Sequence, residues 1–321
     1  MQKYIVKEVE EGQTLFNYVK KVLKDAPMSV IYKLFRKKDV KVNGHWQKEK
    51  YIISANEEIS IYLPDDKIDE FKKIKEVNNA SNISSWIIYE DENVILINKP
   101  RGVLVQKDDS NEDALDDMVI AYLKAKEDYD PHSSLGFVPA PIHRLDRNTA
   151  GIIIFGKNLK TVQYLTSIIN DKEKISKQYL TLVKGHIDVK GDIIAPLYKK
   201  STHVEVNEEL GKDAVTHYEL DRYVNDFSLV RVKLLTGRTH QIRVHFSYLG
   251  HPVIGDKKYG DFNLNKEIEE KYGFKNQFLV AYSLEFIKLD GFLSYLSNTS
   301  FEIKLPQECL ELLRILEDNK K

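Results

Sequence analysis

The sequence predicts an α+β fold with a largely antiparallel mixed central sheet, preceded by a small α/β domain at the N-terminus. Segments with the alternating pattern of strands outnumber segments with helical spacing. The two kinds of segment do not alternate regularly along the chain, as they would in a parallel α/β protein. With 321 residues and 42% hydrophobic content, the chain is long enough for more than one packed domain.

The N-terminal domain is predicted to span residues 1–64. Apolar residues recur at helical spacing before and after Pro27, and Ser29 is expected to cap the second helix. Asn43-Gly44 favours the tight turn of a β-hairpin. The expected elements are helices over 15–23 and from Ser29 onward, strands over 40–42 and 59–63, and a hairpin at Asn43-Gly44 with its return strand led by Trp46.

This domain also concentrates positive charge. The whole chain has a net charge of −1, but residues 15–50 hold ten Lys or Arg against three Asp or Glu. Binding of a polyanion depends on the charge of the contacting face and not on the molecular total. A solvated helix face is the simpler interpretation, but the helix–helix–hairpin order favours contact with RNA. The residues expected to make that contact are Lys33, Arg36, Lys37, Lys38 and Lys41.

Residues 65–85 are polar and poor in core-forming side chains, so they are predicted to be a linker to a second domain over 86–321. That domain is expected to hold most of the strands. Its expected elements are strands over 87–92, 94–100, 151–157, 175–183, 214–218, 228–235 and 278–287; helices over 113–127, 159–170 (capped by Asn158), 242–249 and 305–316; and a charged insertion over 261–276.

The sequence HRLDRNTAG, residues 143–151, is the most informative stretch of the chain. It places the carboxylate of Asp146 between the guanidinium groups of Arg144 and Arg147 and leads into a fully apolar run. A carboxylate beside positive charges is favoured in its ionised form. Such a group can act as a nucleophile or a general base, or Asp146 can simply cap a turn. The local sequence alone favours neither interpretation.

Residues 143–151 resemble the HRLDRxTSG motif of the RluA-type pseudouridine synthases, with Ala150 where serine is usual. Two further strings resemble motifs of that family in the same order: Lys177-x-Tyr179, and LTGRTHQIRVH over 235–245. Flanking strings over 98–105 and 250–260 also match, and residues 12–63 resemble the S-four-like RNA-binding domain. The resemblance therefore covers nearly the whole chain.

The resemblance implies roles for individual residues. Asp146 would be the essential carboxylate, which either attacks the ribose or removes a ribose proton to give a glycal. Arg243 would pair with Asp146. Tyr179 would pack against the target base, since stacking on a base contributes roughly 1–3 kcal/mol. Arg144 would fill the space left by the flipped uridine, because extruding a nucleotide costs a few kcal/mol. The remaining residues expected to bind the substrate are Arg147, Arg238, His240 and Gln241.

No cofactor or metal is expected. The reaction breaks a carbon–nitrogen bond and forms a carbon–carbon bond within one nucleoside, so it needs no redox partner or group donor. Residues 151–157 fit the P-loop spacing GxxxxGK, but the intervening residues are apolar and Asn158 replaces the hydroxyl that would hold magnesium. Cys309 is the only cysteine, which excludes an internal disulfide and a multi-cysteine metal cluster. The histidines interpreted as structural rather than metal-binding are His143, His240, His245 and His251.

The sequence therefore predicts an isomerase that converts uridine to pseudouridine, with large-subunit ribosomal RNA as the favoured partner and transfer RNA as the second choice. A non-catalytic RNA-binding ribosome-assembly factor is the alternative from another class. The chain has no apolar run of membrane-spanning length and no apolar signal core near its first residues. A cytoplasmic monomer without membrane contact is expected.

Overall fold

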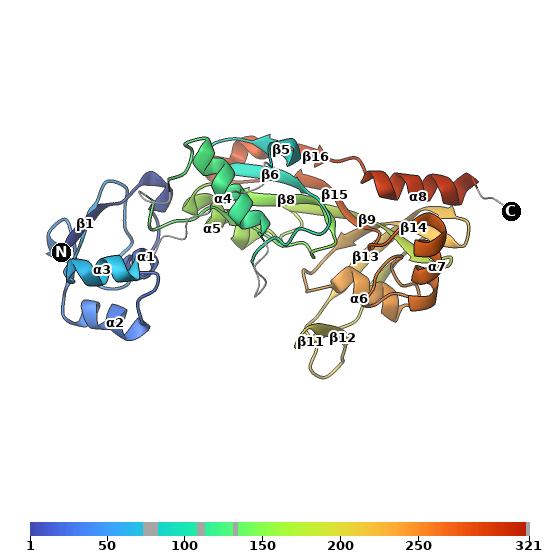
Figure 1. Cartoon of the computed structure of the whole chain (residues 1–321), viewed down its shortest axis with the longest axis horizontal. Coiled ribbons are helices and arrows are strands. Elements are labelled where there is room, and N and C mark those ends of the chain that lie inside the picture. Colours follow the sequence, from blue (N-terminus) through green and yellow to red (C-terminus); the bar gives the residue numbers. More distant parts are fainter. Residues whose placement is uncertain (73–82, 108–112, 131–133, 319–321) are drawn as a thin grey trace. The chain divides into compact units, whose positions relative to one another are not determined.

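The computed structural model describes residues 1–72, 83–107, 113–130 and 134–318. Within it the chain forms two compact units; Figure 1 labels their helices and strands. Unit 1 comprises residues 1–96, 106–142 and 154–166, and unit 2 comprises 97–105, 143–153 and 167–321. The N-terminal segment predicted as a separate domain belongs to unit 1. The boundaries predicted at residues 64 and 86 stay a prediction.

Unit 1 begins with a four-stranded antiparallel sheet in the order β1-β4-β2-β3. Buried side chains of the flanking helices and of the sheet form one hydrophobic cluster, which includes Leu15, Ile31 and Ile59. The elements are β1 (Gln2–Ile5), η1 (Glu8–Glu10), α1 (Leu15–Val22), α2 (Met28–Arg36), β2 (Val40–Val42), β3 (His45–Trp46), β4 (Glu58–Ile61) and α3 (Asp65–Phe71).

The local signals of this segment are confirmed with one exception. Asn43 and Gly44 both have positive φ, 48° and 81°, as the tight hairpin between β2 and β3 requires. The predicted cap of the second helix at Ser29 is wrong. Helix α2 begins one residue earlier, at Met28, because the fixed φ of Pro27 suits a helix start and its carbonyl accepts the first helical hydrogen bond, from Val30 N–H.

The first residues of the predicted linker are helical. Ile68 of α3 is fully buried in the N-terminal cluster, which explains why this polar stretch folds onto the domain. Residues 73–82 lie outside the described residues. The other elements that lie wholly or partly in unit 1 are η2 (Ser84–Trp86), β5 (Ile87–Glu90), β6 (Val94–Lys99), α4 (Leu115–Ala125), β7 (Ala140–Pro141), β8 (Ala150–Gly156) and α5 (Leu159–Ile168). Asn158 caps α5, as predicted, by accepting a hydrogen bond of 2.8 Å from Thr161 N–H.

Unit 2 is built on a mixed, mostly antiparallel sheet. Its strands follow the order β10-β13-β14-β9-β15-β8, with β16 also paired to β15. Only the pairing of β15 with β8 is parallel among the strand pairs described for this unit. The elements are β9 (Ile175–Lys184), β10 (Lys190–Ile194), β11 (Leu197–Lys200), β12 (His203–Val206), β13 (Val215–Val224), β14 (Phe227–Leu234), α6 (Gln241–Tyr248), α7 (Phe262–Tyr272), β15 (Leu279–Phe286), η3 (Gly291–Leu296), β16 (Thr299–Glu302) and α8 (Gln307–Asp318).

The two faces of this sheet are used differently. Helices α7 and α8 cover one face, where Leu182, Leu229 and Leu312 share a hydrophobic cluster. Tyr179 has the opposite parity on β9 and therefore points to the other face. Helix α6 packs on that face, where Tyr218 and Phe246 have ring centroids 5.8 Å apart. Tyr179 and helix α6 therefore share one face of the sheet.

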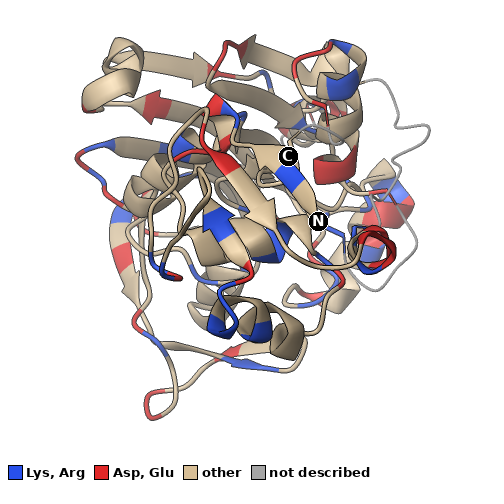
Figure 2. Cartoon of the chain, turned by 90° about the vertical axis from the view of Figure 1, so that its left-hand side faces the viewer, with Lys and Arg blue, Asp and Glu red and all other residues tan. Residues whose placement is uncertain are grey.

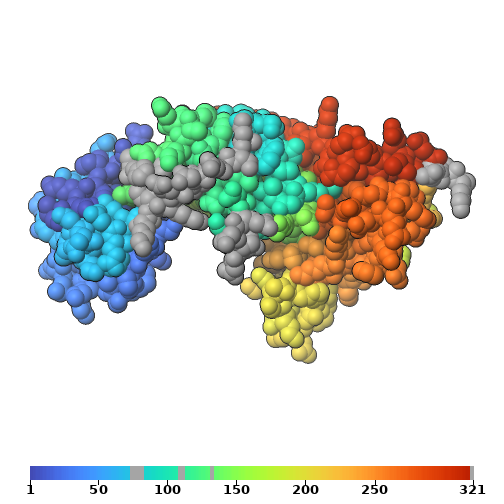
Figure 3. All heavy atoms as spheres, in the orientation of Figure 1, coloured from blue at the N-terminus to red at the C-terminus, as the bar shows by residue number. Residues whose placement is uncertain are grey.

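Two segments of unit 2 lie beside this sheet. The charged insertion over 261–276 contains α7, which Asp261 caps at its start and Gly273, with φ 70°, ends. The hairpin β11–β12 projects from its unit, as the yellow segment of Figure 3 shows. No helix in the part of the chain that the structure describes is long and apolar enough to cross a membrane.

Candidate active site

The turn that carries Asp146 leads directly into β8, and the sheet fixes where it lies. Gly151 on β8 pairs with Ala281 on β15, and Ala281 pairs with Tyr179 on β9. Gly151 has φ 129°, and a Cβ added there would lie 2.3 Å from the carbonyl oxygen of Ala281. Only glycine permits this close approach. The glycine of the motif therefore brings the Asp146 turn to within two strands of Tyr179.

Lys99 stabilises this turn through hydrogen bonds to its backbone. Its fully buried ammonium donates hydrogen bonds of 2.9–3.0 Å to the carbonyl oxygens of Pro100, Val103 and Arg147. Burial lowers the pKa of Lys99 to about 7, although the nearby Asp146 charge acts in the opposite direction. The lysine of the strand-end Asn-Lys-Pro string therefore fastens the backbone of the residue that follows Asp146.

Arg243 on α6 links two carboxylates. Its Nη1 donates to Asp146 Oδ2 at 2.8 Å, which confirms the predicted pairing of these residues. Its Nε and Nη2 donate to the two oxygens of Asp256 at 2.7 and 2.8 Å. Burial opposes ionisation of Asp256, but its hydrogen bonds and charge attraction with Arg243 outweigh burial and lower its pKa. Asp256 thus fixes the arginine, and the arginine fixes Asp146, whose side chain is 25% exposed.

His240 borders the same carboxylate and begins α6. Its Nε2 lies 3.9 Å from Asp146 Oδ1, and its backbone is left-handed, with φ 54°. The hydroxyl of Tyr259 accepts a hydrogen bond from Val204 N–H at 3.0 Å and lies 2.8 Å from His240 Nδ1. Because burial lowers the pKa of His240, we assign a neutral imidazole whose Nδ1 accepts a hydrogen bond from the Tyr259 hydroxyl, with Nε2–H on the side of Asp146. A left-handed non-glycine residue at this point is typical of a functional site.

Tyr179 lies on the face of β9 against which α6 packs, and the charge of Asp146 reaches it. Its side chain is 6% exposed, and no hydrogen bond joins its hydroxyl to another residue of the described chain. Burial raises the pKa of Tyr179, and the Asp146 charge raises it further. The ring is therefore neutral and electrostatically coupled to Asp146. An aromatic face with a protonated hydroxyl is available to a ligand held at the carboxylate.

The structure places the other predicted substrate-binding residues in two settings. The side chain of Arg144 is exposed. Arg147 and Arg238 are exposed but each donates from Nε to a backbone carbonyl, of Gly102 and Asp213, at 3.0 Å. Gln241 is buried: its amide nitrogen donates to Val215 O and Thr216 Oγ1, and its amide oxygen accepts two further hydrogen bonds. The geometry thus suits Gln241 to holding the loop before α6 rather than to touching a ligand.

Sequence reasoning assigned no role to Asp256 and Tyr259. Both lie in the string over 250–260 that was noted for its resemblance, so the signal was present. What the sequence does not show is that Asp256 would bind Arg243, thirteen residues earlier, with both oxygens. The two more distant histidines have structural contacts: His245 bonds Thr216 Oγ1 and Ala195 O, and His251 bonds Lys184 O.

Of the basic residues predicted to bind RNA, Lys33 and Arg36 lie on α2, Lys37 and Lys38 in the turn after it, and Lys41 on β2, all in unit 1. The side chains of Lys33, Arg36, Lys37 and Lys38 are exposed, and Lys41 is half-buried. Lys38 lies over the ring of Trp46 at 5.1 Å and Lys41 over the ring of Tyr62 at 4.8 Å. Figure 2 shows acidic as well as basic residues on this side of the chain.

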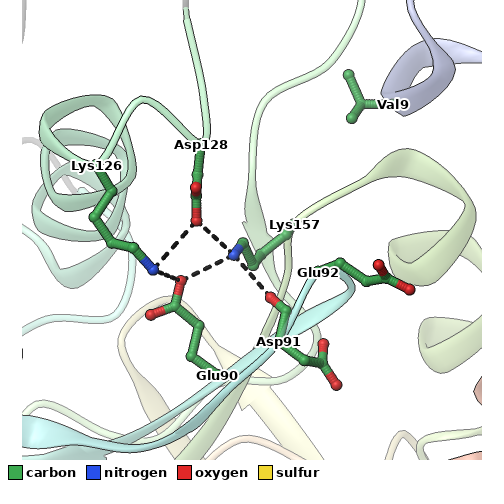
Figure 4. A pocket seen from close by; sticks show the side chains of 7 residues that line it. All are labelled: Val9, Glu90, Asp91, Glu92, Lys126, Asp128 and Lys157. Atoms are coloured by element: carbon green, nitrogen blue, oxygen red, sulfur yellow. Dashed lines mark hydrogen bonds and ion pairs between the residues drawn. The ribbon is translucent and has the colours of Figure 1, made fainter.

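A separate polar pocket of about 430 Å³ lies in unit 1. Its lysines are already neutralised: Lys157 pairs with Glu90 at 2.9 Å and with Asp128 at 2.8 Å, and Lys126 pairs with the same two carboxylates (Figure 4). Closed ion pairs of this kind serve structure. None of the lining residues is among Asp146, Tyr179, His240, Arg243 and Asp256.

A mixed, mostly antiparallel sheet with an aspartate, an arginine and a tyrosine brought together in one unit is the arrangement that the resemblance to the RluA-type pseudouridine synthases implies. The chain matches the family model described as RNA pseudouridylate synthase over residues 93–248. It is 33% identical to an uncharacterized RNA pseudouridine synthase of Mycoplasma capricolum over 93% of this chain and 96% of the relative. It belongs to the RNA pseudouridine synthase family.

Two further similarities agree with this assignment. The ribosomal large subunit pseudouridine synthase C of Haemophilus influenzae is 34% identical over 88% of this chain and 85% of the relative. The solved structure of human RNA pseudouridylate synthase domain containing 4 superposes with a TM-score of 0.59, at 20% identity over 73% of this chain and 94% of that chain. The second likeness confirms the predicted α+β pseudouridine synthase fold.

Proposed function

We propose that this chain isomerises uridines of large-subunit ribosomal RNA to pseudouridine, with Asp146, Tyr179 and Arg243 as the catalytic residues. The observation that carries the proposal is the chain of contacts from Asp256 through Arg243 to Asp146 on the face of the sheet that also presents Tyr179. A factor that only docked on RNA would not need a partly exposed carboxylate fixed in this way. Relatives named for the large ribosomal subunit support the choice of RNA.

In this mechanism Asp146 acts on the ribose of a flipped uridine, by attack on the sugar or by removal of a sugar proton. Arg243 keeps the carboxylate ionised and oriented, since two opposite unit charges about 4 Å apart attract by roughly 4 kcal/mol at an effective dielectric of 20. Tyr179 packs against the uracil base after its bond to the ribose is broken and while the base turns so that carbon-5 can bond to the sugar. Arg144 and Arg147, with Arg238 and His240, would contact the surrounding RNA. The basic residues Lys33, Arg36, Lys37, Lys38 and Lys41 of unit 1 would bind phosphates of the RNA.

The experiment is to incubate the full chain and its Asp146→Asn variant with unmodified transcripts of large-subunit ribosomal RNA and of transfer RNA, and to score pseudouridine. The wild type should modify the ribosomal transcript, and the variant should bind it without modifying it. Modification of the transfer RNA alone would show that transfer RNA, and not ribosomal RNA, is the substrate. Equal binding without modification by either protein would favour the docking factor. A monomer in the cytoplasm stays our prediction from the sequence.

A further inference from the structure

Lys177 precedes Tyr179 by two residues on β9, so both side chains point to the same face of the sheet. Two residues of a strand span ~6.6 Å, which is comparable to the length of a nucleotide from its base to its phosphate. The Lys177 side chain is half-buried, and its ammonium forms no ion pair or hydrogen bond with any residue of the described chain. The side chains of the unpaired lysine and of the tyrosine therefore leave the strand about one nucleotide's length apart, on the same face.

Its surroundings are also positive. Burial lowers the pKa of Lys177 to about 7, and the charge of Lys172 contributes to the same shift. Burial likewise lowers the pKa of Lys172, with Lys233 adding to the effect and Asp171 opposing it. His143, three residues before Asp146, has its pKa lowered by burial and by the Lys177 charge. The charge of Lys177 therefore acts on His143, in the segment that leads to Asp146, and Lys172 is a second positive charge near it.

Two other buried lysines of this chain show what a structural lysine looks like. Lys99 donates to three backbone carbonyls, and Lys157 is held by Glu90 and Asp128. Lys177 has no comparable partner in the described structure, so its burial destabilises its own charged form. A group kept at such a cost to folding is typical of a binding site.

We propose that Lys177, assisted by Lys172, binds a backbone phosphate of the RNA beside the nucleotide held at Asp146 and Tyr179. A phosphate is favoured over a uracil carbonyl because two neighbouring ammonium groups need a full negative charge between them, whereas a carbonyl oxygen carries only part of one. The inference rests on the proposed function, because it takes the ligand to be RNA.

The first test needs no RNA. The thermal midpoint of the full chain is compared with those of Lys177→Met and of Lys190→Met, a control at an exposed lysine on β10 of the same unit. Methionine keeps the apolar stem of the lysine without its charge, so Lys177→Met should raise the midpoint while the control leaves it unchanged. A lower midpoint for Lys177→Met would assign the lysine a structural role and overturn the proposal.

The second test measures binding of the large-subunit ribosomal transcript. Lys177→Met should bind at least about tenfold more weakly, the effect of one hydrogen bond to a charged group, and should reduce the slope of log affinity against log salt by roughly 1. Lys190→Met should do neither. An unchanged salt slope for Lys177→Met would show that the lysine contacts no phosphate.

The third test is calorimetric binding at pH 8 in two buffers of different ionisation enthalpy. At this pH the amine is largely neutral in the free protein, and a bound phosphate should draw a proton onto it. Lys177→Arg, which is charged at every working pH, should keep the affinity but take up fewer protons than the wild type. Equal proton uptake by both proteins would contradict the proposal.

The outcomes separate the two proposals of this site. Pseudouridine formation by a wild type whose Lys177 variants bind normally would leave the function intact and remove the phosphate site. Phosphate-dependent binding without pseudouridine formation would leave the phosphate site intact and remove the function.

Discussion

Asp256 holds the guanidinium of Arg243 through two hydrogen bonds of 2.7 and 2.8 Å and leaves Nη1 for Asp146. The Asp256 side chain is fully buried, whereas Asp146 is 25% exposed. The buried carboxylate of Asp256 therefore neutralises the charge of Arg243. The carboxylate of Asp146 stays partly accessible to a ligand. The inner pair orients the outer carboxylate before any substrate arrives.

Replacing Asp256 by asparagine should destabilise the protein, because it breaks a buried ion pair and leaves the Arg243 charge only partly compensated. The expected loss in the free energy of unfolding is about 3–5 kcal/mol, measured by urea denaturation. Asp261→Asn is the matched control. Asparagine can still cap α7, so this variant loses only the surface ion pair of Asp261 with Lys184 and should cost about 0–1 kcal/mol. Equal losses in the free energy of unfolding for the two variants would show that Asp256 contributes no more to stability than a surface carboxylate.

Gly151→Ala tests the close approach of β8 to β15. The new Cβ would meet the Ala281 carbonyl oxygen at 2.3 Å, in a backbone conformation that side chains rarely adopt. The loss of stability should exceed the roughly 1–3 kcal/mol of backbone strain alone. Gly273→Ala, also at positive φ but with open space around it, should cost only about 1–2 kcal/mol. Similar unfolding midpoints for the two variants would contradict the steric argument.

Arg144→Ala separates an RNA-contacting role from a structural one. The side chain is exposed, so the free energy of unfolding should change by no more than about 0.5 kcal/mol. Pseudouridine formation should nevertheless fall by about tenfold to hundredfold, since stacking contributes roughly 1–3 kcal/mol. Both quantities can be measured on one preparation. Full activity in the variant would exclude Arg144 from supporting the flipped nucleotide.

Lys37→Glu combined with Lys38→Glu tests the basic residues at the C-terminal end of helix α2, in the turn that follows it. Reversing two exposed charges should weaken binding of ribosomal RNA and flatten its salt dependence by roughly 1–2 in the log–log slope. Lys288→Glu with Lys304→Glu makes the same change in net charge at exposed positions of unit 2 and should affect binding less. If both double variants behave alike, net charge rather than this helix governs RNA binding.

The sequence predicted those parts of the molecule that depend on local patterns. The hairpin at Asn43-Gly44 and the Asn158 cap are decided by a few neighbouring residues, and both are confirmed. The predicted cap at Ser29 is wrong because Pro27, two residues earlier, also favours the start of this helix. The charged insertion concealed α7, because a helix that buries mainly Ile268 needs few apolar positions.

The candidate site was predictable where a motif marked its residues. The contact between Asp146 and Arg243 followed from the family resemblance and is confirmed at 2.8 Å. The role of Asp256 was not predictable from residue types, because it depends on how the segment after α6 folds back onto Arg243. The sequence also could not predict that Lys177 lacks an ion-pair partner. A lysine in a strand is usually a surface residue, and its neighbours in space are known only from the structure.

His245 should make stability depend on pH. Its Nε2–H donates to Ala195 O, and its Nδ1 bonds Thr216 Oγ1, so the folded protein holds it as a buried neutral imidazole. Burial lowers the pKa of His245 below its ordinary value of about 6.5. Below that pH the unfolded chain binds a proton that the folded chain refuses, so the stabilisation is complete above pH 6.5 and is lost as the pH falls.

Urea unfolding between pH 7.5 and pH 5 measures this effect. His245→Gln replaces the imidazole with an amide that does not titrate, so the free energy of unfolding should fall less steeply with decreasing pH than in the wild type. The difference can reach about 1.4 kcal/mol per pH unit for one proton. His143 and His240, whose pKa values burial also lowers, should leave some slope in the variant. Identical slopes in the two proteins would mean that His245 accepts its proton within the fold.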